Sequence, residues 1–411
     1  MSVSSCRFCG TKLTNSFCDL GMSPLSNSYL DTSQLDKMER FYPLHAYVCE
    51  KCFLVQLPEF ESPENIFSDY AYFSSYSKSW LEHAKAYAEK MIERFGFNEN
   101  NKVIEVASND GYLLQYFQEK GIPVLGIEPA ENVAKVAQDV GISTVVKFFG
   151  ANTAKELVSE GIQADLLAGN NVFAHVPDIN DFTEGLSILL NPNGVITLEF
   201  PHLLRLIEQV QFDTIYHEHF SYLSLITVKK IFDKYNLVIF DVDELPTHGG
   251  SIRIYACHKN NNNQSVSQNV SIVEEREKSA GLDKIKTYSD FSERVKNIKR
   301  NILDSLIQIK RQGKSIVGYG AAAKGNTLLN YCGIGSDFID YTVDISPHKQ
   351  NHYLPGTHIP IYHPDKIKQT RPDYVFILPW NIKSEILEQT SFIHEWNGKH
   401  IIPIPEVEVI E

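Results

Sequence analysis

Apolar runs of strand length alternate with helix-length stretches through the middle of the chain. Four such runs occur, at residues 102–107, 123–128, 164–169 and 194–200. Strands that alternate with helices typically form a parallel sheet covered by helices on both faces. The pattern therefore predicts a doubly wound α/β domain over residues 73–245.

The C-terminal part of the chain shows a similar alternation. Residues 241–258 are predicted to form two strands around a Thr-His-Gly-Gly turn, and residues 290–311 an amphipathic helix. Strand candidates follow at residues 315–319, 339–345 and 374–379. We interpret residues 246–411 as a second, Rossmann-like α/β domain.

Residues 1–72 have little periodicity and many turn residues, but they contain two Cys-x-x-Cys pairs. Cys6 and Cys9 are separated from Cys49 and Cys52 by 39 intervening residues. Four thiolates can close a tetrahedral zinc site, which supplies folding energy to a segment with little core. Because four protein ligands leave no open coordination position, the predicted zinc is structural. A redox pair and an iron–sulfur cluster are the alternatives.

Composition narrows the possible partners. The chain has 411 residues, and its formal net charge of −13 argues against a nucleic-acid partner. It has neither a run of 18 apolar residues nor the apolar core of a signal peptide, so we expect a cytoplasmic protein without a membrane partner. We also expect a monomer.

The first strand of the α/β domain runs into a turn of small residues. This segment, Val-Ile-Glu-Val-Ala-Ser-Asn-Asp-Gly, begins at residue 103. Small residues let a ligand approach the backbone, and an acid at the strand end can accept hydrogen bonds from the ligand. Ser108 and Asn109 stand where glycines are expected, which weakens a pyrophosphate-binding interpretation. The candidate cofactor-binding residues here are Glu105, Ala107, Ser108, Asn109 and Gly111.

Two further strand ends complete the predicted cofactor site. Glu128 and Pro129 end the second strand, where a carboxylate grips the ribose hydroxyls of an adenosine cofactor in doubly wound folds. Asn170 and Asn171 follow the strand at residues 164–169. A solvated charge or a helix cap is the alternative interpretation of Glu128.

A Tyr-His-Glu-His block follows the strand that ends near residue 200. Tyr216, His217, Glu218 and His219 supply a base with tuning partners near neutral pH. A metal site is a competing interpretation, although two histidines two positions apart do not share one side of a helix. A polar loop with one hydrogen-bonded histidine is the structural alternative.

A strand, a turn rich in glycine and alanine, and a helix are predicted again at residues 317–327. Backbone N–H groups at such a turn can hold a diphosphate, and Lys324 adds charge. Asn326 and Thr327 are further candidates for substrate binding, together with Gly249 and Gly250. A tight structural turn is the alternative.

These motifs, in this order, resemble the nucleotide-sugar C-methyltransferase family that makes branched-chain deoxysugars. The resemblance covers nearly the whole chain, and the family also lacks glycines at the Ser-Asn-Asp-Gly turn. It implies a zinc-binding domain at residues 1–72, an S-adenosylmethionine-binding class I methyltransferase domain at residues 73–245, and a C-terminal Rossmann-like domain at residues 246–411 that helps to bind the nucleotide sugar.

The resemblance also implies the reaction, which is methyl transfer from S-adenosylmethionine to C3 of a nucleotide-linked 4-keto-deoxysugar. His219 matches the family's catalytic base, with Tyr216 and Glu218 beside it, and either Tyr70 or Tyr72 completes the pocket. Removal of the C3 proton gives an enolate, because the adjacent carbonyl takes up the charge. The nucleotide carrier, thymidine or guanosine diphosphate, stays open.

Two other function classes remain as alternatives. Two Rossmann-like units would suit a nicotinamide-dependent oxidoreductase acting on a nucleotide sugar, although the first turn lacks the Gly-x-Gly-x-x-Gly pattern. The second alternative is a non-catalytic binding protein stabilised by zinc.

Overall fold

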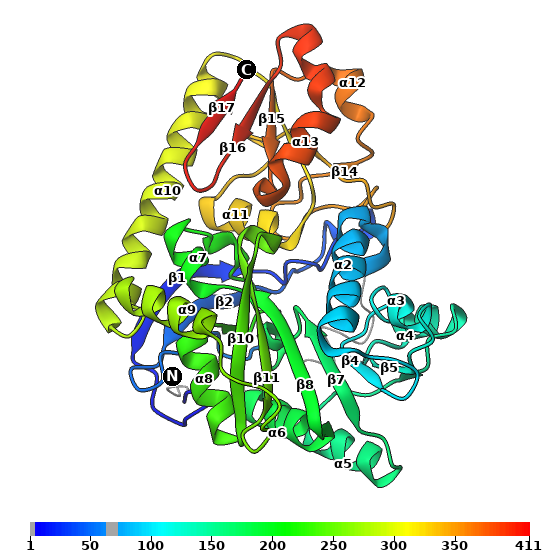
Figure 1. Cartoon of the computed structure of the whole chain (residues 1–411). Helices are drawn as coiled ribbons and strands as arrows, with labels where there is room; N and C mark the ends of the chain where they lie inside the picture. Colours follow the sequence, from blue (N-terminus) through cyan, green and yellow to red (C-terminus); the bar gives the residue numbers. More distant parts are fainter. Residues whose placement is uncertain (1–4, 63–72) are drawn as a thin grey trace. The chain divides into compact units, whose positions relative to one another are not determined.

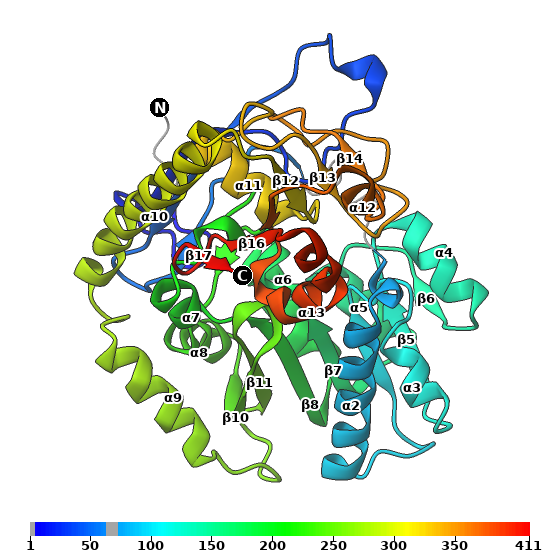
Figure 2. The same cartoon turned by 90° about the horizontal axis from the view of Figure 1, so that it is seen from above.

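The computed structural model describes residues 5–62 and 73–411, and it groups the chain into two compact units. Unit 1 comprises Met1–Leu13, Cys49–Leu203 and Phe220–Asp283. Unit 2 comprises Thr14–Val48, Leu204–His219 and Lys284–Glu411. Each unit is therefore assembled from stretches that are far apart in the sequence. Figures 1 and 2 show the helices and strands of the chain, coloured along the sequence.

Unit 1 is built around a seven-stranded sheet, counted over the described residues. In sheet order its strands are β10 (Leu237–Leu245), β11 (Ser251–His258), β8 (Leu190–Pro201), β7 (Ala164–Asn170), β4 (Val103–Val106), β5 (Val124–Ile127) and β6 (Thr144–Val145). From β8 to β6 neighbouring strands are parallel, whereas β11 runs antiparallel to β8 and β10. All four residues of β4 are buried, as a central parallel strand requires. The predicted doubly wound α/β fold is confirmed.

Helices cover this sheet. They are α2 (Lys78–Phe95), α3 (Leu114–Gln118), α4 (Glu131–Asp139), α5 (Ala151–Ser159), α6 (Ile179–Leu189), α8 (Leu225–Lys234) and α9 (Gln268–Ser279). The longest, α2, begins where the Ser77 hydroxyl accepts a hydrogen bond from the Trp80 N–H, and it ends at Gly96 with φ 68°. Its amphipathic sequence directs one face to the sheet.

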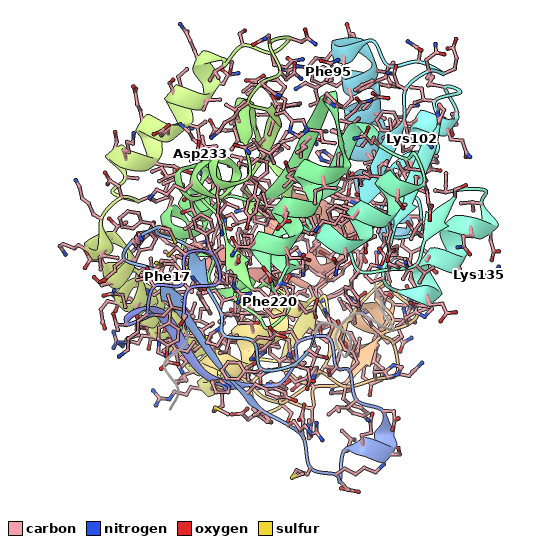
Figure 3. The ribbon with its side chains drawn as sticks, turned by 90° about the horizontal axis from the view of Figure 1, so that it is seen from below. Phe17, Phe95, Lys102, Lys135, Phe220 and Asp233 are labelled. Carbon is pink, nitrogen blue, oxygen red and sulfur yellow. The ribbon has the colours of Figure 1, made fainter. Side chains whose placement is uncertain are left out.

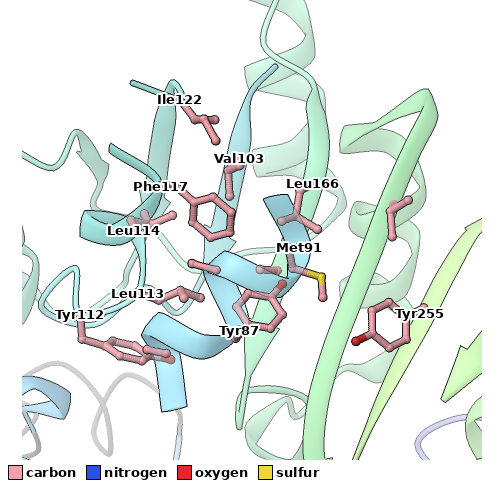
Figure 4. Close-up of a cluster of buried hydrophobic side chains, with 14 of the residues drawn as sticks. Tyr87, Met91, Val103, Tyr112, Leu113, Leu114, Phe117, Ile122, Leu166 and Tyr255 are labelled. Carbon is pink, nitrogen blue, oxygen red and sulfur yellow. The ribbon is translucent and has the colours of Figure 1, made fainter. Parts of the chain in front are cut away.

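The core of unit 1 lies between α2 and the sheet. Tyr87 and Met91 of α2 lie in one buried cluster with Val103 of β4, Leu166 of β7 and Phe117 of α3 (Figure 4). Burying each large apolar side chain contributes roughly 1.5–3 kcal/mol. This packing fixes β4 in the sheet, and with it the turn that follows β4.

Short elements lie between these helices and strands. The 3-10 turns of unit 1 are η2 (Ser74–Tyr76), η3 (Phe173–His175) and η5 (Thr247–Gly249). Strands β3 (Val55–Gln56) and β9 (Ser221–Tyr222) form an antiparallel pair. Helix α7 (Leu203–Glu208) begins in the last residue of a unit 1 stretch and continues into unit 2.

Charged side chains occupy the outward faces of the helices. Lys135 lies on the solvent-facing side of α4 (Figure 3), where it forms an exposed ion pair with Asp139. In residues 5–62 and 73–411, no helix combines the length and apolarity needed to cross a bilayer.

Unit 2 is built around a six-stranded sheet, again counted over the described residues. In sheet order its strands are β14 (Ile361–Tyr362), β13 (Thr342–Val343), β12 (Ile316–Tyr319), β15 (Tyr374–Ile377), β16 (Lys399–Ile402) and β17 (Glu408–Ile410). The pairs are parallel except for β16 and β17. Its helices are α10 (Ile285–Arg311), α11 (Ala323–Cys332), α12 (Lys366–Thr370) and α13 (Lys383–Gln389). Its 3-10 turns are η1 (Thr32–Gln34), η4 (Phe212–Thr214), η6 (Trp380–Ile382) and η7 (Ser391–Trp396).

A hairpin from the N-terminal segment also belongs to unit 2. It consists of β1 (Asn15–Ser23) and β2 (Tyr42–Val48), which pair antiparallel. Phe17 of β1 stacks on Phe291 of α10, with ring centroids 4.6 Å apart. Sequence periodicity does not predict this hairpin, because irregularities after Ser16 and after Asp19 break the alternation of buried and exposed residues.

Candidate active site and zinc site

The four paired cysteines converge within unit 1. Their sulfur atoms all lie within 4.8 Å of one another, with Cys6 and Cys52 at 3.5 Å and Cys9 and Cys49 also at 3.5 Å. A tetrahedral zinc site with Zn–S bonds of about 2.3 Å places its sulfurs roughly 3.8 Å apart. The Gln56 amide donates to the Cys6 sulfur at 3.2 Å, the kind of outer contact that orients a thiolate. These residues fit a structural zinc ion.

The turn after β4 adopts the conformation that small residues were predicted to allow. Ala107, Asn109 and Gly111 have φ values of 56°, 49° and 80°, all in the left-handed region. Ser108 is not among the left-handed residues of this turn. Ser108 instead packs towards β5, where a Cβ added to Gly126 would lie 2.4 Å from its hydroxyl.

Three carboxyl groups lie in or near this turn. Glu128 accepts hydrogen bonds from the backbone N–H groups of Asn109 and Ala130, each at 2.9 Å. Burial raises the pKa of Glu128, and it raises the pKa of Glu105 well above the ordinary value against the opposing effect of the Tyr112 hydroxyl. Asp110 Oδ2 accepts from the Ser75 hydroxyl at 2.6 Å.

Polar atoms in this region are available to a ligand. Within residues 5–62 and 73–411, the Ser108 hydroxyl, Asp110 Oδ1 and Asn170 Oδ1 are buried without a hydrogen-bond partner. Buried polar atoms normally have partners, and a ligand with ammonium and hydroxyl groups would supply them. Together with Glu128, these residues fit the predicted S-adenosylmethionine site. Pro129 is half-buried beside them.

Asn171 and the turn at η5 meet at the same edge of the sheet. The Asn171 side-chain nitrogen lies 2.6 Å from Nε2 of His248, and both residues have φ 55°. Gly249 and Gly250 follow His248 with φ 88° and 116°. These two glycines belong to unit 1, whereas the other predicted substrate-binding residues belong to unit 2.

A buried ion network supports this edge, and no sequence motif predicts it. Glu199 of β8 accepts hydrogen bonds from His83 at 2.9 Å, from Thr247 at 2.8 Å and from Arg253. Burial alone would raise the pKa of Glu199, but His83 and Arg253 lower it to about 2. The partners come from α2, η5 and β11, so only the fold brings them together.

In unit 2, the two ring nitrogens of His219 have different partners. Nδ1 lies 2.9 Å from the Thr214 carbonyl oxygen, and Nε2 lies 2.9 Å from the Tyr216 hydroxyl. A carbonyl oxygen only accepts, so Nδ1 carries the proton and Nε2 of the neutral ring is the basic nitrogen. The structure thus brings Tyr216 and His219 together.

The other two members of the block point to different partners. Glu218 is buried and accepts a hydrogen bond from the Asn27 amide at 2.6 Å. Burial raises the pKa of Glu218 to about 7, and the Asn27 hydrogen bond opposes this change. His217 lies 3.2 Å from the Pro43 carbonyl oxygen, which favours a structural role over the competing metal site with His219.

Lys324 lies in unit 2 at the start of α11. It donates to Asn381 at 2.9 Å, and burial lowers its pKa while Asp213 opposes that change. Burial raises the pKa of Asp213 to about 6, and the Trp380 indole donates to its carboxylate at 2.7 Å. Asp213 lies three residues before Tyr216, so these contacts connect the C-terminal fold to the Tyr-His-Glu-His block.

The two other substrate-binding candidates on α11 are almost fully buried. Asn326 and Thr327 are each 1% exposed. Thr327 Oγ1 lies 3.4 Å from the Ser26 hydroxyl, and within the described residues the Asn326 amide atoms are buried without a hydrogen-bond partner.

Asp344, which sequence reasoning missed, ends β13 of unit 2. It accepts a hydrogen bond from the Ala321 N–H at 2.8 Å, and Lys349 lies 3.5 Å away. The Tyr29 hydroxyl donates to the Ala321 carbonyl oxygen at 2.5 Å. The available signal was an acid at a strand end after a glycine-rich turn, as at Glu128. Tyr70 and Tyr72 lie outside the described residues.

Sequence models of three protein domains match the chain. A zinc binding domain matches residues 6–67, a methyltransferase domain residues 80–242, and a C-methyltransferase C-terminal domain residues 246–405.

Individual proteins match as well. C-methyltransferase NovU of Streptomyces niveus is 35% identical over 408 residues, which cover 99% of this chain and 97% of that protein. Ubiquinone biosynthesis O-methyltransferase of Bordetella avium is 30% identical over 108 residues, 26% of this chain and 45% of that protein. Among solved structures, the PH0226 protein of Pyrococcus horikoshii has a TM-score of 0.38 at 14% identity and covers 48% of this chain and 99% of that one.

The fold, the cysteine cluster and the sequence matches define the class of protein as an S-adenosylmethionine-dependent methyltransferase with a zinc-binding domain. More narrowly, the chain belongs to the C-methyltransferase family that includes NovU. Its cofactor is S-adenosylmethionine, and its metal is zinc.

Proposed function

We propose that the protein transfers a methyl group to C3 of a nucleotide-linked 4-keto-deoxyhexose, with His219 as the base. The observation that carries the proposal is the fixed tautomer of His219. Because the Thr214 carbonyl holds the proton on Nδ1, Nε2 is the basic nitrogen, and it takes the proton of an acidic carbon when the Tyr216 hydroxyl turns from it towards the substrate oxygen.

The chemistry of a 4-keto sugar matches this base. The C3–H proton goes to Nε2 of His219, and the electron pair of the broken bond moves onto the C4 carbonyl oxygen to form an enolate. The Tyr216 hydroxyl, 2.9 Å from Nε2, is placed to exchange a proton with the imidazole or to donate to the developing oxyanion. The enolate then provides the carbon nucleophile that C-methylation requires.

The residues of unit 1 would hold the cofactor, whose sulfonium supplies an electrophilic methyl group when it is bound. Glu128 would accept hydrogen bonds from the ribose hydroxyls, as acids at this position do in doubly wound folds. Asp110, Asn170 and Glu105 would face its polar and cationic groups. The left-handed turn at Ala107 and Asn109 keeps side chains clear of the ligand.

Unit 2 would hold the nucleotide sugar. Lys324 and Lys349 lie near the carboxyl ends of its strands, where ligands bind in open α/β sheets, and their charges suit a diphosphate. The substrate-binding role of Gly249 and Gly250, which belong to unit 1, stays a prediction. The proposal includes the domain division 1–72, 73–245 and 246–411, which the three matched domains support.

Mass spectrometry of the complete reaction tests this proposal. The protein is incubated with S-adenosylmethionine and a panel of thymidine- and guanosine-diphosphate 4-keto-deoxyhexoses that carry deuterium at C3. We expect one carrier class to gain one CH2 unit with loss of the deuterium. Bound zinc and saturable S-adenosylmethionine binding without a gain on any member would refute the keto-sugar assignment and leave the methyltransferase class intact.

The same samples distinguish the oxidoreductase alternative. A nicotinamide-dependent enzyme would change NADH absorbance with these sugars and would not alter their mass by a CH2 unit. We expect no change in NADH absorbance.

A further inference from the structure

Arg7 lies between the zinc ligands Cys6 and Cys9, but its side chain reaches away from the metal. Its guanidinium donates to the Pro177 carbonyl oxygen at 2.5 Å and also to the Leu57 carbonyl oxygen. Arginine suits this task, because its planar fork can serve two acceptors at once without losing its charge.

The first acceptor belongs to a loop that leads directly to the candidate cofactor site. Pro177 ends the loop that starts at Asn171, directly after β7. Leu57 directly follows β3, which pairs with β9. One side chain therefore holds one end of each segment.

A third segment meets the same side chain. The Arg7 guanidinium lies over the ring of Phe220, 5.4 Å from its centroid, and the Leu57 N–H donates to the Phe220 carbonyl oxygen at 3.0 Å. Phe220 is 1% exposed and is the residue after His219 (Figure 3). A buried cation–π contact of this kind holds the guanidinium and the ring together.

The loop between the zinc ligands Cys6 and Cys9 forms hydrogen bonds with residues next to these segments. The Asn180 amide donates to the Arg7 and Phe8 carbonyl oxygens at 2.7 and 3.1 Å. Gln56 accepts from the Arg7 N–H at 2.9 Å and donates to the Cys6 sulfur at 3.2 Å. The conformation of the Cys6–Cys9 loop, which zinc fixes, therefore determines where the guanidinium points.

We propose that Arg7 is a positioning residue through which the zinc site sets the geometry of the cofactor-side loop 170–177 and of the chain at Leu57 and Phe220. The zinc then does more than stabilise its own domain, because its occupancy controls the ordering of that loop. The link to catalysis rests on the proposed function, whereas the link to loop order and cofactor binding rests on the methyltransferase class alone.

The test compares Arg7→Lys and Arg7→Met with the wild-type protein, all with full-length chains. Zinc content is measured by elemental analysis, S-adenosylmethionine binding by calorimetry, and backbone order by hydrogen exchange. We expect both variants to keep their zinc, to exchange faster at residues 171–177 and 57–60, and to bind S-adenosylmethionine about tenfold more weakly, since neither side chain has the planar fork that serves both carbonyl oxygens. Wild-type protein stripped of zinc by a chelator should show faster exchange in the same two segments.

Arg276→Lys is the matched control. Arg276 donates to both Glu244 carboxylate oxygens at 2.6 Å on the surface of unit 1, so the same substitution removes a bidentate contact far from the zinc ligands in sequence. We expect wild-type exchange and cofactor affinity for this variant.

Two results would overturn the proposal. One is unchanged exchange at residues 171–177 in both Arg7 variants. The other is faster exchange spread evenly over unit 1, including α2 and α9, which would mean general destabilisation. Both readouts are taken without a sugar, so they stand whether or not a keto sugar proves to be the acceptor.

Discussion

The two units share a local arrangement at one turn and differ in the charges around it. In each, a strand runs into a turn whose backbone N–H is held by an acid at the end of the neighbouring strand. Asn109 donates to Glu128 at 2.9 Å in unit 1, and Ala321 donates to Asp344 at 2.8 Å in unit 2. The similarity is one of backbone architecture, since the two sheets have different strand orders.

The groups around the two acids differ. Glu128 shares its surroundings with Glu105 and Asp110, and burial raises its pKa. Asp344 has Lys349 at 3.5 Å, and Lys324 lies at the start of the helix that follows the turn. The first set suits a cofactor with a sulfonium and an ammonium group, and the second suits an anionic ligand. Under the proposed function, the charges around the shared turn, rather than the turn itself, determine which ligand each unit accepts.

The largest expected effect concerns His219 of unit 2, the base of the proposed reaction. His219→Asn should lower kcat by about 10²- to 10⁴-fold, because general-base catalysis is lost. S-adenosylmethionine affinity should stay within about twofold, since the cofactor turn belongs to unit 1. Transfer of labelled methyl groups and calorimetry check the two halves of this prediction.

His217→Asn is the control for that substitution, because His217 lies two positions away and bonds to the Pro43 carbonyl. It should retain most of the activity. A His219→Asn variant with a near wild-type rate would show that the base lies elsewhere.

The next effect concerns the response of each unit to pH. The pKa of Glu218 is about 7 in the folded protein and about 4.5 ordinarily, so its contribution to stability is fully present below pH 4.5 and is lost as the pH rises through 7. Glu218→Gln should therefore stabilise the protein at about pH 8 by roughly 2–3 kcal/mol. It should also make the free energy of unfolding less dependent on pH between these two pKa values. Denaturant unfolding at about pH 5 and pH 8 measures the difference.

Glu199 in unit 1 should behave in the opposite way. Its pKa of about 2 lies below the ordinary 4.5, so its contribution is present above pH 4.5 and is lost as the pH falls through 2. Glu199→Gln should destabilise the protein by about 3 kcal/mol at both test values, because it leaves Arg253 buried without its counter-charge. If Glu218→Gln and Glu199→Gln changed the free energy of unfolding in the same direction at about pH 8, the opposite pKa shifts assigned to the two acids would be contradicted.

A smaller effect separates the two acids at the turns. Glu128→Gln should weaken S-adenosylmethionine binding about tenfold, through the loss of charged hydrogen-bond acceptors. Asp344→Asn should leave that affinity unchanged and alter only the KM of the methyl acceptor. Calorimetry with the cofactor and steady-state kinetics with the methyl acceptor measure the two effects. Weakened cofactor binding in both variants would show that the two turns do not serve different ligands.

The smallest effect concerns the left-handed residues of the unit 1 turn. Ala107→Gly relieves an unfavourable φ of 56° but adds freedom to the unfolded chain, so a net gain of about 0.5 kcal/mol is expected. Ala137→Gly, in the interior of α4, should instead cost about 1 kcal/mol. Thermal unfolding compares the two, and a loss of stability in both would show that the alanine at position 107 is not strained.

Local sequence patterns were enough for the central strands and for the zinc ligands. The run at residues 102–107 became β4, and the helix predicted at 290–311 became α10, which begins five residues earlier, at Ile285. Both depend on side-chain periodicity, which is a local property. The four cysteines were recognisable for a similar reason, since each pair has ligand spacing by itself.

Partners across long sequence distances could not be predicted. Asn27 donates a hydrogen bond to Glu218, and Arg253 donates one to Glu199. Neither Asn27 nor Arg253 lies in a recognisable sequence motif. The strand candidate at residues 339–345 shortened to the two residues of β13, because apolar composition does not determine where strand pairing ends. Membership of the hairpin in unit 2 likewise follows only from its contact with α10.

The six stretches that make up the two units alternate along the chain, and this order constrains how the protein is made. During synthesis, Phe17 of the hairpin leaves the ribosome long before Phe291, the ring on which it stacks. Every stretch of unit 1 has been synthesised by Asp283, whereas unit 2 at that point still lacks its longest stretch, Lys284–Glu411. The hairpin must therefore wait, with its apolar face uncovered, while the cofactor-binding unit folds, which makes it the segment for which a nascent-chain chaperone has most reason to bind.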